Sequence, residues 1–454
     1  MWGSTARVCA AMWLLAACVA CAGPQVERYR AQRDALERAR GPEPLEAQAP
    51  EADPFVGEAA LSRRELIARV LERNPGLGAA RAGWQAALAR YPQATALADP
   101  MFGYGVRPRS FGSDRVDDAQ EFELSQAFPF PGKRSLRGEQ ALAMADAAGE
   151  GLEQERVRLA ALASMLFDDY WLAERALETN AAHLALLEEL RTVALARYAA
   201  GSGTKESVLA AETEHTLLRH DQILLRADRR IAVEQINTLL HRSPELALPP
   251  PPRVLDVTSG HGLEVSALVQ RAFELRPDLR AREARIRARE AAVALARREY
   301  LPDFALRGGY DGAMQESPLR PFVGIELNLP LQLERRRAAL EEANAELTRE
   351  QRLRQRLEDR VRYEVTSTLE RLREVQHLLD LTLESLLPTA SERVASARAA
   401  FETGQVGFGD LVDAERALRA AELGEHEARA SLSARHAELA RALGEVPYSE
   451  EESR

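Results

Sequence analysis

The reactive side chains of this 454-residue chain are not spaced as a catalytic or metal site would need. His215 and His220 are five residues apart and do not share a helix face well enough to form a zinc pair. Asp168 and Asp169 are adjacent on a predicted helix, so they point in different directions, and we expect them on a solvated surface. Neither a phosphate-binding loop nor a nucleophile elbow occurs. The sequence therefore predicts no enzyme, no cofactor and no metal site.

Two other carboxylates are spaced so that both could interact with ions. Asp410 and Asp413 are three residues apart, so both can face the same side of a helix. They follow a glycine cluster, Gly404, Gly407 and Gly409, that predicts a turn before the helix. Carboxylates on one helix face can line an aperture that favours cations. Aspartates in the first turn of a helix are also stabilised by its dipole on an ordinary solvated surface, so the spacing alone leaves both interpretations open.

These residues belong to the second copy of a duplicated architecture. Segments of the first half recur in the second half at an offset of 201 to 203 residues. The matched segments are Asn74–Leu77 and Arg276–Leu279, Asp99–Phe102 and Leu301–Phe304, Phe128–Phe130 and Leu329–Leu331, Tyr198–Gly201 and Phe401–Gly404, and Ala211–Glu212 and Ala414–Glu415. The sequence therefore predicts one repeat at 61–250 and a second at 251–447. A short tail follows at 448–454, and a poorly ordered tether with one short helix (Val26–Arg40) precedes the repeats at 18–60.

Each repeat contains two segments in which apolar residues alternate with small or polar ones, as half-buried antiparallel strands require. The alternating apolar residues are Phe102, Tyr104 and Val106, then Phe122, Leu124 and Phe128, then Phe304 and Leu306, and finally Val323, Ile325, Leu327 and Leu329. This alternation suits a barrel whose outside meets lipid, and it equally suits a small hairpin packed on a soluble core. Four strands cannot close a barrel alone, so a barrel requires several copies of the chain.

Each strand pair is followed by a very long helical pattern. No proline occurs from Gly138 to Tyr198, and 61 helical residues would span about 90 Å. The second run, Arg335–Phe401, contains a single proline, Pro388, which should bend the helix. Both runs end at glycines and are followed by a returning helix, at Glu206–His241 or at Asp410–Leu443. The sequence thus predicts antiparallel helical hairpins, and their length favours a tube or coiled coil over a globular core.

The composition agrees with long helices and argues against one class of partner. Charged residues make up 29% of the chain and aromatic residues only 6%, as in long helices and coiled coils. The net charge of −10 argues against a nucleic-acid binder. The arginines are interleaved with glutamates along the predicted helices, so ion pairs on helix faces account for them.

The N-terminus predicts export. Residues 1–17 carry one positive charge and then an apolar run that is too short to span a bilayer permanently, which is typical of a signal peptide. Leu15 to Cys18 resembles a bacterial lipobox, in which Cys18 becomes the lipidated first residue of the mature protein. Cys21 is the alternative acceptor, and an ordinary cleaved signal with incidental cysteines is also open. Val19 after Cys18 favours the outer membrane, by resemblance to bacterial lipoproteins.

Strand, strand, long helix and return helix, duplicated behind a lipobox, resemble the TolC family of outer-membrane efflux channels. The closest local match is a helix–glycine–turn–helix segment, which runs from Leu387-Pro388 through Ala400–Gly404 to Asp410–Glu415. Leu124–Gln126 with Phe128–Arg134 resembles the segment that leaves the barrel in the lipoprotein branch for heavy-metal efflux (CusC/CzcC-like). The resemblance covers about residues 61–447. It implies a mainly α-helical fold with a small β part and an internal tandem repeat.

The resemblance also implies an assembly. Three copies would form a homotrimer, in which each copy contributes four strands to one twelve-stranded transmembrane β-barrel and its helices to a long periplasmic α-helical barrel. The trimer would dock onto a periplasmic adaptor (membrane fusion) protein and an inner-membrane pump, often of the resistance–nodulation–division (RND) type. The implied function is passive export of small molecules or metal ions, with energy from the pump.

The same resemblance assigns roles at the periplasmic end. Asp410 and Asp413 fall where family members place acidic rings, and Phe401, which pairs with Tyr198 of the first repeat, falls where an aromatic residue helps to hold the entrance closed. Ser207 replaces the acidic residue in the first repeat, and Val406 stands where some members have a partnering arginine, so we expect a less tightly locked gate. The turns expected to dock the adaptor comprise Gly201, Ser202, Gly203, Gly404, Gln405 and Val406.

A protein of another class fits the same helices. A lipid-anchored periplasmic coiled-coil scaffold or adaptor would have the tether and the hairpins but no pore. The two hypotheses differ over the strands, because only a channel needs Phe122, Val323 and Ile325 in lipid.

Overall fold

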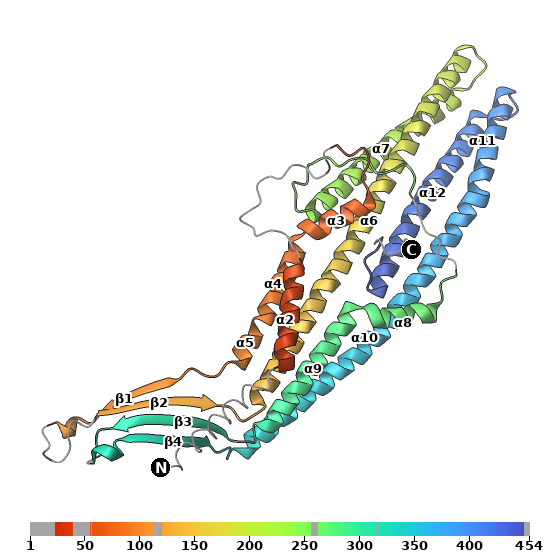
Figure 1. Cartoon of the computed structure of the whole chain (residues 1–454). Helices are drawn as coiled ribbons and strands as arrows, with labels where there is room; N and C mark the ends of the chain where they lie inside the picture. The colour runs from red at the N-terminus through yellow and green to blue at the C-terminus, as the bar shows by residue number, and fades with distance from the viewer. Residues whose placement is uncertain are drawn as a thin grey trace. The chain divides into compact units, whose positions relative to one another are not determined.

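The computed structural model describes residues 23–39, 55, 57–111, 114, 120–255, 262–314 and 316–448, and this part is mainly helical with one antiparallel sheet (Figure 1). The predicted fold class is confirmed. The predicted signal peptide, Cys18 and Cys21 lie outside the described residues. The chain is divided into two compact units, and each unit contains segments from both halves of the sequence. Unit 1 holds the described residues of 1–40, 80–152 and 278–357, and unit 2 holds those of 41–79, 153–277 and 358–454.

The two halves of the chain have the same order of elements. After α2 (Gly23–Arg38), the first half contains α3 (Arg63–Arg73), α4 (Pro75–Leu88), α5 (Arg90–Thr95), β1 (Met101–Val106), β2 (Gln120–Phe128), α6 (Lys133–Ala199) and α7 (Lys205–Leu239). The second half contains α8 (Val265–Leu275), α9 (Pro277–Arg298), β3 (Asp303–Asp311), β4 (Pro321–Asn328), α10 (Leu333–Leu381), the π-helical turn η5 (Thr382–Leu386), α11 (Leu387–Glu402) and α12 (Phe408–Leu443). Among the helices described here, none has a stretch both long enough and apolar enough to cross a membrane.

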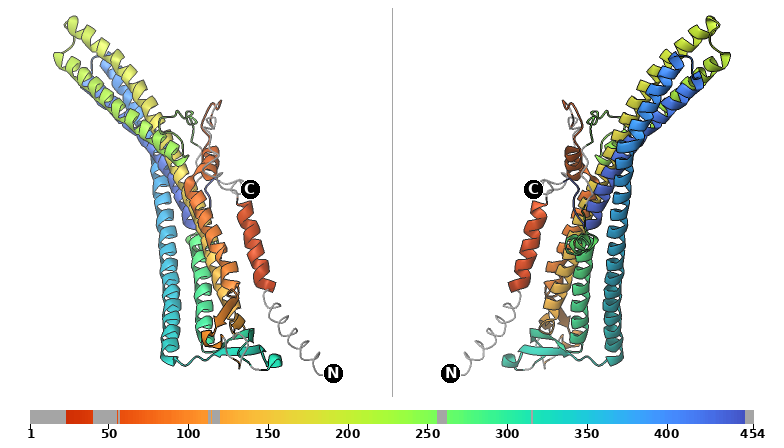
Figure 2. Two further views of the ribbon diagram at one scale, coloured as in Figure 1. Left: turned by 90° about the vertical axis from the view of Figure 1, so that its left-hand side faces the viewer. Right: turned by 90° about the vertical axis from the view of Figure 1, so that its right-hand side faces the viewer.

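Glycine turns close the two predicted hairpins, in which α6 runs beside α7 and α11 beside α12 (Figures 1 and 2). Gly201 and Gly404 have φ values of +71° and +74°, a left-handed conformation that favours glycine. At the end of α6 the carbonyl of Arg197 accepts hydrogen bonds from the N–H groups of Ser202 and Gly203, over 2.9 and 3.0 Å. The hairpins predicted from the sequence are therefore confirmed.

The break at Pro388 takes the form of a wider helical turn. Pro388 lies at the start of α11, directly after η5, and the N–H of Leu387 donates to the carbonyl of Thr382 five residues earlier. Proline has no N–H and its ring collides with the carbonyl of the preceding turn, so a π-type turn relieves both problems without ending the helix. The sequence correctly located this irregularity.

The sheet lies in unit 1 and has the order β1-β2-β3-β4, with every neighbouring pair antiparallel. Phe102 lies opposite Leu124, Leu124 opposite Gly308, and Gly308 opposite Val323. Because directly opposite residues point to the same face, the registers collect the alternating apolar residues of all four strands on one face. The other face carries Gly103, Gly105, Glu121, Glu123, Arg307, Gly324 and Glu326.

Helix α2 is not part of a loose tether. Its Leu36 packs with Leu88, Tyr91 and Leu142 in an apolar core of unit 1, and Tyr29 stacks on Tyr91 with ring centroids 4.9 Å apart. The short helix predicted at Val26–Arg40 is therefore confirmed as α2 (Gly23–Arg38), but it packs on unit 1 and is not a poorly ordered tether. The apolar positions of α2 could not be recognised in its Arg-rich sequence, because they are few, although Tyr29 and Leu36 share one side of the helix.

Asp168 is buried, although we expected it on a solvated surface. Arg63 of α3 donates to its Oδ1 over 2.5 Å and also to Ser164, and the guanidinium of Arg63 lies 4.8 Å from the ring centre of Phe167. Burial raises the pKa of Asp168 to about 7, against the opposing effect of the Arg63 charge. This network ties α3 to α6 within unit 2.

Candidate channel entrance

The turns of both hairpins share one apolar core in unit 2. It contains residues from α6, α7, α11 and α12, namely Leu187, Leu190, Ala194, Val208, Ala211, Leu218, Phe401, Phe408, Leu411 and Val412. The core joins the two hairpins side by side, so their turns form one tip. We call this region of α6, α7, α11 and α12 the tip.

Phe401 is an internal residue of the tip. Its side chain is buried and makes an edge-to-face contact with Phe408, with ring centroids 5.8 Å apart. The guanidinium of Arg197 lies 4.2 Å from the centre of the Phe401 ring and donates to the Phe401 carbonyl over 3.4 Å. Tyr198, the next residue on α6, is instead 48% exposed. Phe401 thus links α6 to α11, whereas Tyr198 faces outward from its own chain.

The two aspartates of α12 make different contacts. Asp410 Oδ2 accepts from the N–H of Gly407 over 2.9 Å and so fixes the start of the helix. Asp413 Oδ1 accepts from Arg416 Nη1 over 3.1 Å, yet the Asp413 side chain remains 61% exposed. Asp413 is therefore the freer of the two carboxylates to face solvent or ions.

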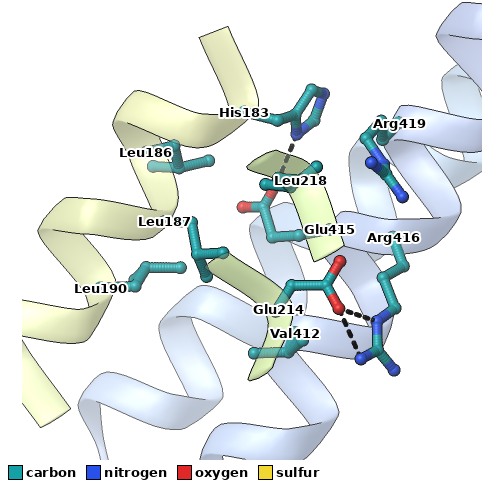
Figure 3. Close-up of a pocket in the computed structure, with 10 residues that line it drawn as sticks. All are labelled: His183, Leu186, Leu187, Leu190, Glu214, Leu218, Val412, Glu415, Arg416 and Arg419. Atoms are coloured by element: carbon teal, nitrogen blue, oxygen red, sulfur yellow. Dashed lines mark hydrogen bonds and ion pairs between the residues drawn. The ribbon is translucent and has the colours of Figure 1, made fainter. Parts of the chain in front are cut away.

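A small pocket between the hairpins is lined by an ion pair whose carboxylate is buried and whose arginine is half-exposed (Figure 3). Glu214 of α7 is only 6% exposed and accepts from Arg416 Nε over 2.6 Å. One turn further along α12, Arg419 donates to Asp221 of α7 over 3.0 Å. Both ion pairs connect α12 to α7, so charge pairing as well as apolar contact holds the hairpins together.

On the opposite side of the same pocket, His183 of α6 lies beside Glu415 of α12 (Figure 3), and outside the pocket it also contacts Glu422. Its Nε2 is 2.8 Å from Glu422 Oε2, and its Nδ1 is 3.9 Å from Glu415 Oε2. Burial raises the pKa of Glu415. The sequence had not predicted these residues as a site, although one signal was available, because Glu214 occupies a core position in the apolar periodicity of α7 between Ala211 and Leu218.

The sheet of unit 1 presents one apolar and one charged face. On the apolar face, Phe102, Ile325 and Val323 are 69%, 70% and 89% exposed. On the charged face, Arg307 Nη1 lies 3.5 Å from Glu123 Oε1, and Arg307 Nε lies 3.6 Å from Glu326 Oε2. A soluble domain does not normally expose so large an apolar sheet face.

Comparisons with known proteins agree with these features. The family model of the outer membrane efflux protein matches residues 268–445. The fold is similar to that of the outer-membrane channel OprN, at a TM-score of 0.72 and 20% identity, covering 88% of this chain and 97% of that one. It is also similar to CusC (0.71, 18% identity, 88% and 96% covered) and to VceC, an outer membrane protein of Vibrio cholerae (0.71, 18% identity, 85% and 97% covered).

Residues 268–445 match the outer membrane efflux protein family, and the chain as a whole has the fold of the TolC-like outer-membrane channels. A search of curated proteins gave no match, so the assignment depends on the family model and on the fold. Family and fold are those of channels, not of enzymes, and the alternative of a scaffold without a pore is not favoured. The matched family and the similar structures are those of outer-membrane channels with a large periplasmic helical part.

The predicted entrance residues separate into two groups. Asp410, Asp413 and Tyr198 lie at the surface of the chain. Phe401 is enclosed by Arg197 and Phe408, and Val406 packs against the same core. The turn residues Gly201, Ser202, Gly404 and Gln405 are exposed at the end of the tip.

Proposed function

We propose that three copies of this chain form one passive export channel across the outer membrane. The observation that carries the proposal is the open four-stranded sheet, whose apolar face is exposed and whose edge strands β1 and β4 have no further partner among the described strands. β1 and β4 run in opposite directions, so β4 of one copy can pair antiparallel with β1 of the next. Three copies supply twelve strands, with the apolar face toward lipid and the charged face toward water.

The tip forms the periplasmic entrance of this channel. Asp413 and Asp410 of the three copies place six carboxylates around one aperture, which favours cations over anions. Tyr198 narrows the aperture, and Phe401 acts from inside the tip by fixing α11 against Arg197 of α6. The exposed turns at Gly201–Gly203 and Gly404–Val406 dock a periplasmic adaptor, which connects the channel to an inner-membrane pump of the RND type.

The N-terminus anchors the protein to the same membrane. Gln25 of α2 donates to Ser135 Oγ near the start of α6 over 3.0 Å, so α2 begins beside the point where the chain leaves β2. A lipid chain on Cys18, or on Cys21, adds membrane affinity through its buried methylenes. Mass spectrometry of the mature N-terminus in Cys18→Ser and Cys21→Ser variants identifies the acceptor, because only loss of the true acceptor removes the acyl mass.

A pair of adjacent substitutions tests the membrane-facing sheet. Ile325→Lys places a charge on the lipid face and should cost about 2–4 kcal/mol near the bilayer midplane, so the protein should no longer resist carbonate and urea extraction. Glu326→Lys changes the charged face, where Glu326 is exposed and its ion pair with Arg307 is long, and should leave extraction unchanged. Release of the unmodified protein by these washes would refute the channel.

A second experiment tests the acidic entrance. Asp413→Asn removes charge without affecting the helix start, whereas Asp410→Ala also removes the hydrogen bond from Gly407, worth about 1 kcal/mol of helix stability. In planar bilayers, Asp413→Asn should raise single-channel conductance or reduce block by divalent cations, and the double variant Asp410→Ala/Asp413→Ala should do so more strongly. Unchanged conductance and block in both would exclude an acidic ring at these positions.

A further inference from the structure

Four connections join the sheet of unit 1 to its helices, and all four lie at the same end of the sheet (Figure 1). They link α5 to β1, β2 to α6, α9 to β3 and β4 to α10. We call residues 95–100, 129–137, 297–303 and 329–337 the collar. The collar holds eight arginine or lysine side chains and four carboxylates, a net charge of +4, in a chain whose net charge is −10. Positive charge is therefore concentrated where the sheet meets the helices.

Three arginines of the collar donate to backbone carbonyls at these connections. Within the described part of the chain, none of the three forms an ion pair with a carboxylate. A backbone carbonyl orients a guanidinium but does not neutralise its charge, and it leaves several of the five N–H donors unused. The three bonds are Arg134 Nη2 to the Thr95 carbonyl over 2.6 Å, Arg298 Nη1 to the Pro131 carbonyl over 2.5 Å, and Arg336 Nε to the Glu299 carbonyl over 2.7 Å.

The carboxylates of the collar are engaged by other cations. Buried Lys133 lies 3.3 Å from Glu299 Oε2 and 2.8 Å from Asp303 Oδ1, and Arg337 lies 3.1 Å from Glu334 Oε1. The fourth carboxylate, Asp99, is exposed. Two more arginines, at 297 and 335, are exposed and have no ion pair among the described residues. The excess positive charge of the collar is therefore not balanced from within this chain.

Exposed leucines lie beside these arginines. Leu329, Leu331 and Leu333 connect β4 to α10, and Leu331 is 81% exposed. Leu329 continues the alternation that places Ile325 and Leu327 on the apolar face of the sheet. Apolar side chains next to arginines, at the border of an apolar surface, are typical of a surface in the lipid headgroup region. There the apolar groups reach the acyl chains while the guanidinium groups stay in the polar layer.

We propose that the collar binds the headgroups of anionic phospholipids in the periplasmic leaflet of the outer membrane. This inference rests on the proposed function, because the sheet enters the membrane only as part of the barrel. A guanidinium presents its N–H donors as a planar fork that matches a phosphate, and anionic headgroups supply the negative charge that the collar lacks. The leucines contact the acyl chains, which a free phosphate does not have. Each arginine near an anionic membrane surface raises the affinity about fivefold.

Native mass spectrometry of the full-length protein in mixed detergent–lipid micelles tests the collar. The micelles contain either phosphatidylglycerol, which is anionic, or phosphatidylcholine, which has a phosphate but no net charge. The unmodified protein should retain phosphatidylglycerol in preference. Arg297→Gln/Arg335→Gln removes two exposed charges of the collar and should lower this preference about 25-fold. Arg219→Gln/Arg226→Gln is the matched control, because it removes two exposed charges from α7, and it should leave the preference unchanged.

Three results would overturn the lipid-binding collar. They are equal retention of the two lipids by the unmodified protein, an equal loss of preference in both double variants, and displacement of the lipid by millimolar inorganic phosphate, which would indicate a site for free phosphate. Carbonate and urea extraction reports separately on the proposed channel. A protein that resists extraction but has no lipid preference contradicts only the collar. A protein that is released by extraction but retains phosphatidylglycerol contradicts only the channel.

Discussion

Removal of Arg416 should destabilise the tip far more than removal of its partner Glu214. The two residues form one ion pair, but Glu214 is 6% exposed whereas Arg416 is 46% exposed and also contacts Asp413. Arg416→Gln leaves a carboxylate buried among Leu187, Leu218 and Val412 without its counter-ion. Glu214→Gln leaves only the guanidinium of Arg416, which water can reach and which keeps its ion pair with Asp413.

The exposed fractions of Glu214 and Arg416 determine how much each substitution should lower the free energy of unfolding. Loss of one member of a buried pair costs about 3–5 kcal/mol, and we expect the low end, about 3 kcal/mol, for Arg416→Gln, because water can enter the space that the half-exposed arginine vacates. Glu214→Gln should cost about 1 kcal/mol, the value of an ordinary hydrogen bond. The double variant has no buried charge and should cost about 1–2 kcal/mol. The coupling between the two sites is then about 2–3 kcal/mol.

Native-state hydrogen exchange of the tip measures these values, because a local region such as the tip can open without unfolding of the whole protein. Exchange of the α7 and α12 peptides should accelerate about 100-fold in Arg416→Gln and about fivefold in Glu214→Gln. The double variant should exchange more slowly than Arg416→Gln alone. If the two single variants cost the same, or if their effects simply add, the carboxylate of Glu214 is not held in place by Arg416 and the reasoning is wrong.

Three further predictions concern other sites. Asp168→Asn should flatten the pH dependence of thermal stability: the folded-state pKa of about 7 exceeds the ordinary value, so the contribution of Asp168 is full below about pH 4 and is lost as pH rises through about 7. A slope unchanged from the unmodified protein would contradict this. Phe401→Ala should cost about 3 kcal/mol and accelerate exchange in α6 as well as α11, whereas Phe401→Leu should cost less. Lys133→Met should lower the heat resistance of the proposed trimer on gels, because buried Lys133 donates to Asp303 over 2.8 Å, to the Leu301 carbonyl over 3.0 Å and to Glu299 over 3.3 Å where β2 passes into α6. Lys205→Met, at the exposed start of α7, is its control.

The helices, strands and turns of this protein could be predicted from its amino-acid order, because their signals are local. Alternation with a period of two located the strands, and the absence of proline located the long helix that became α6. Glycines that need a left-handed backbone located both hairpin turns, and Pro388 located the irregular turn. The resemblance added the family, since the spacing of helix, turn and helix is itself a local pattern.

Which charged and aromatic side chains are buried depends on how the helices pack against one another. His183 and Glu422 are 239 residues apart in the chain, and no local pattern predicts that they touch. The same is true of Asp168 beside Arg63, and of Phe401 beneath Arg197. A charged residue on an amphipathic helix looks solvated until another helix packs over it, because burial depends on the neighbour and not on the helix that carries the residue. The repeats and turns could therefore be predicted, whereas the contacts that hold the two hairpins together could not.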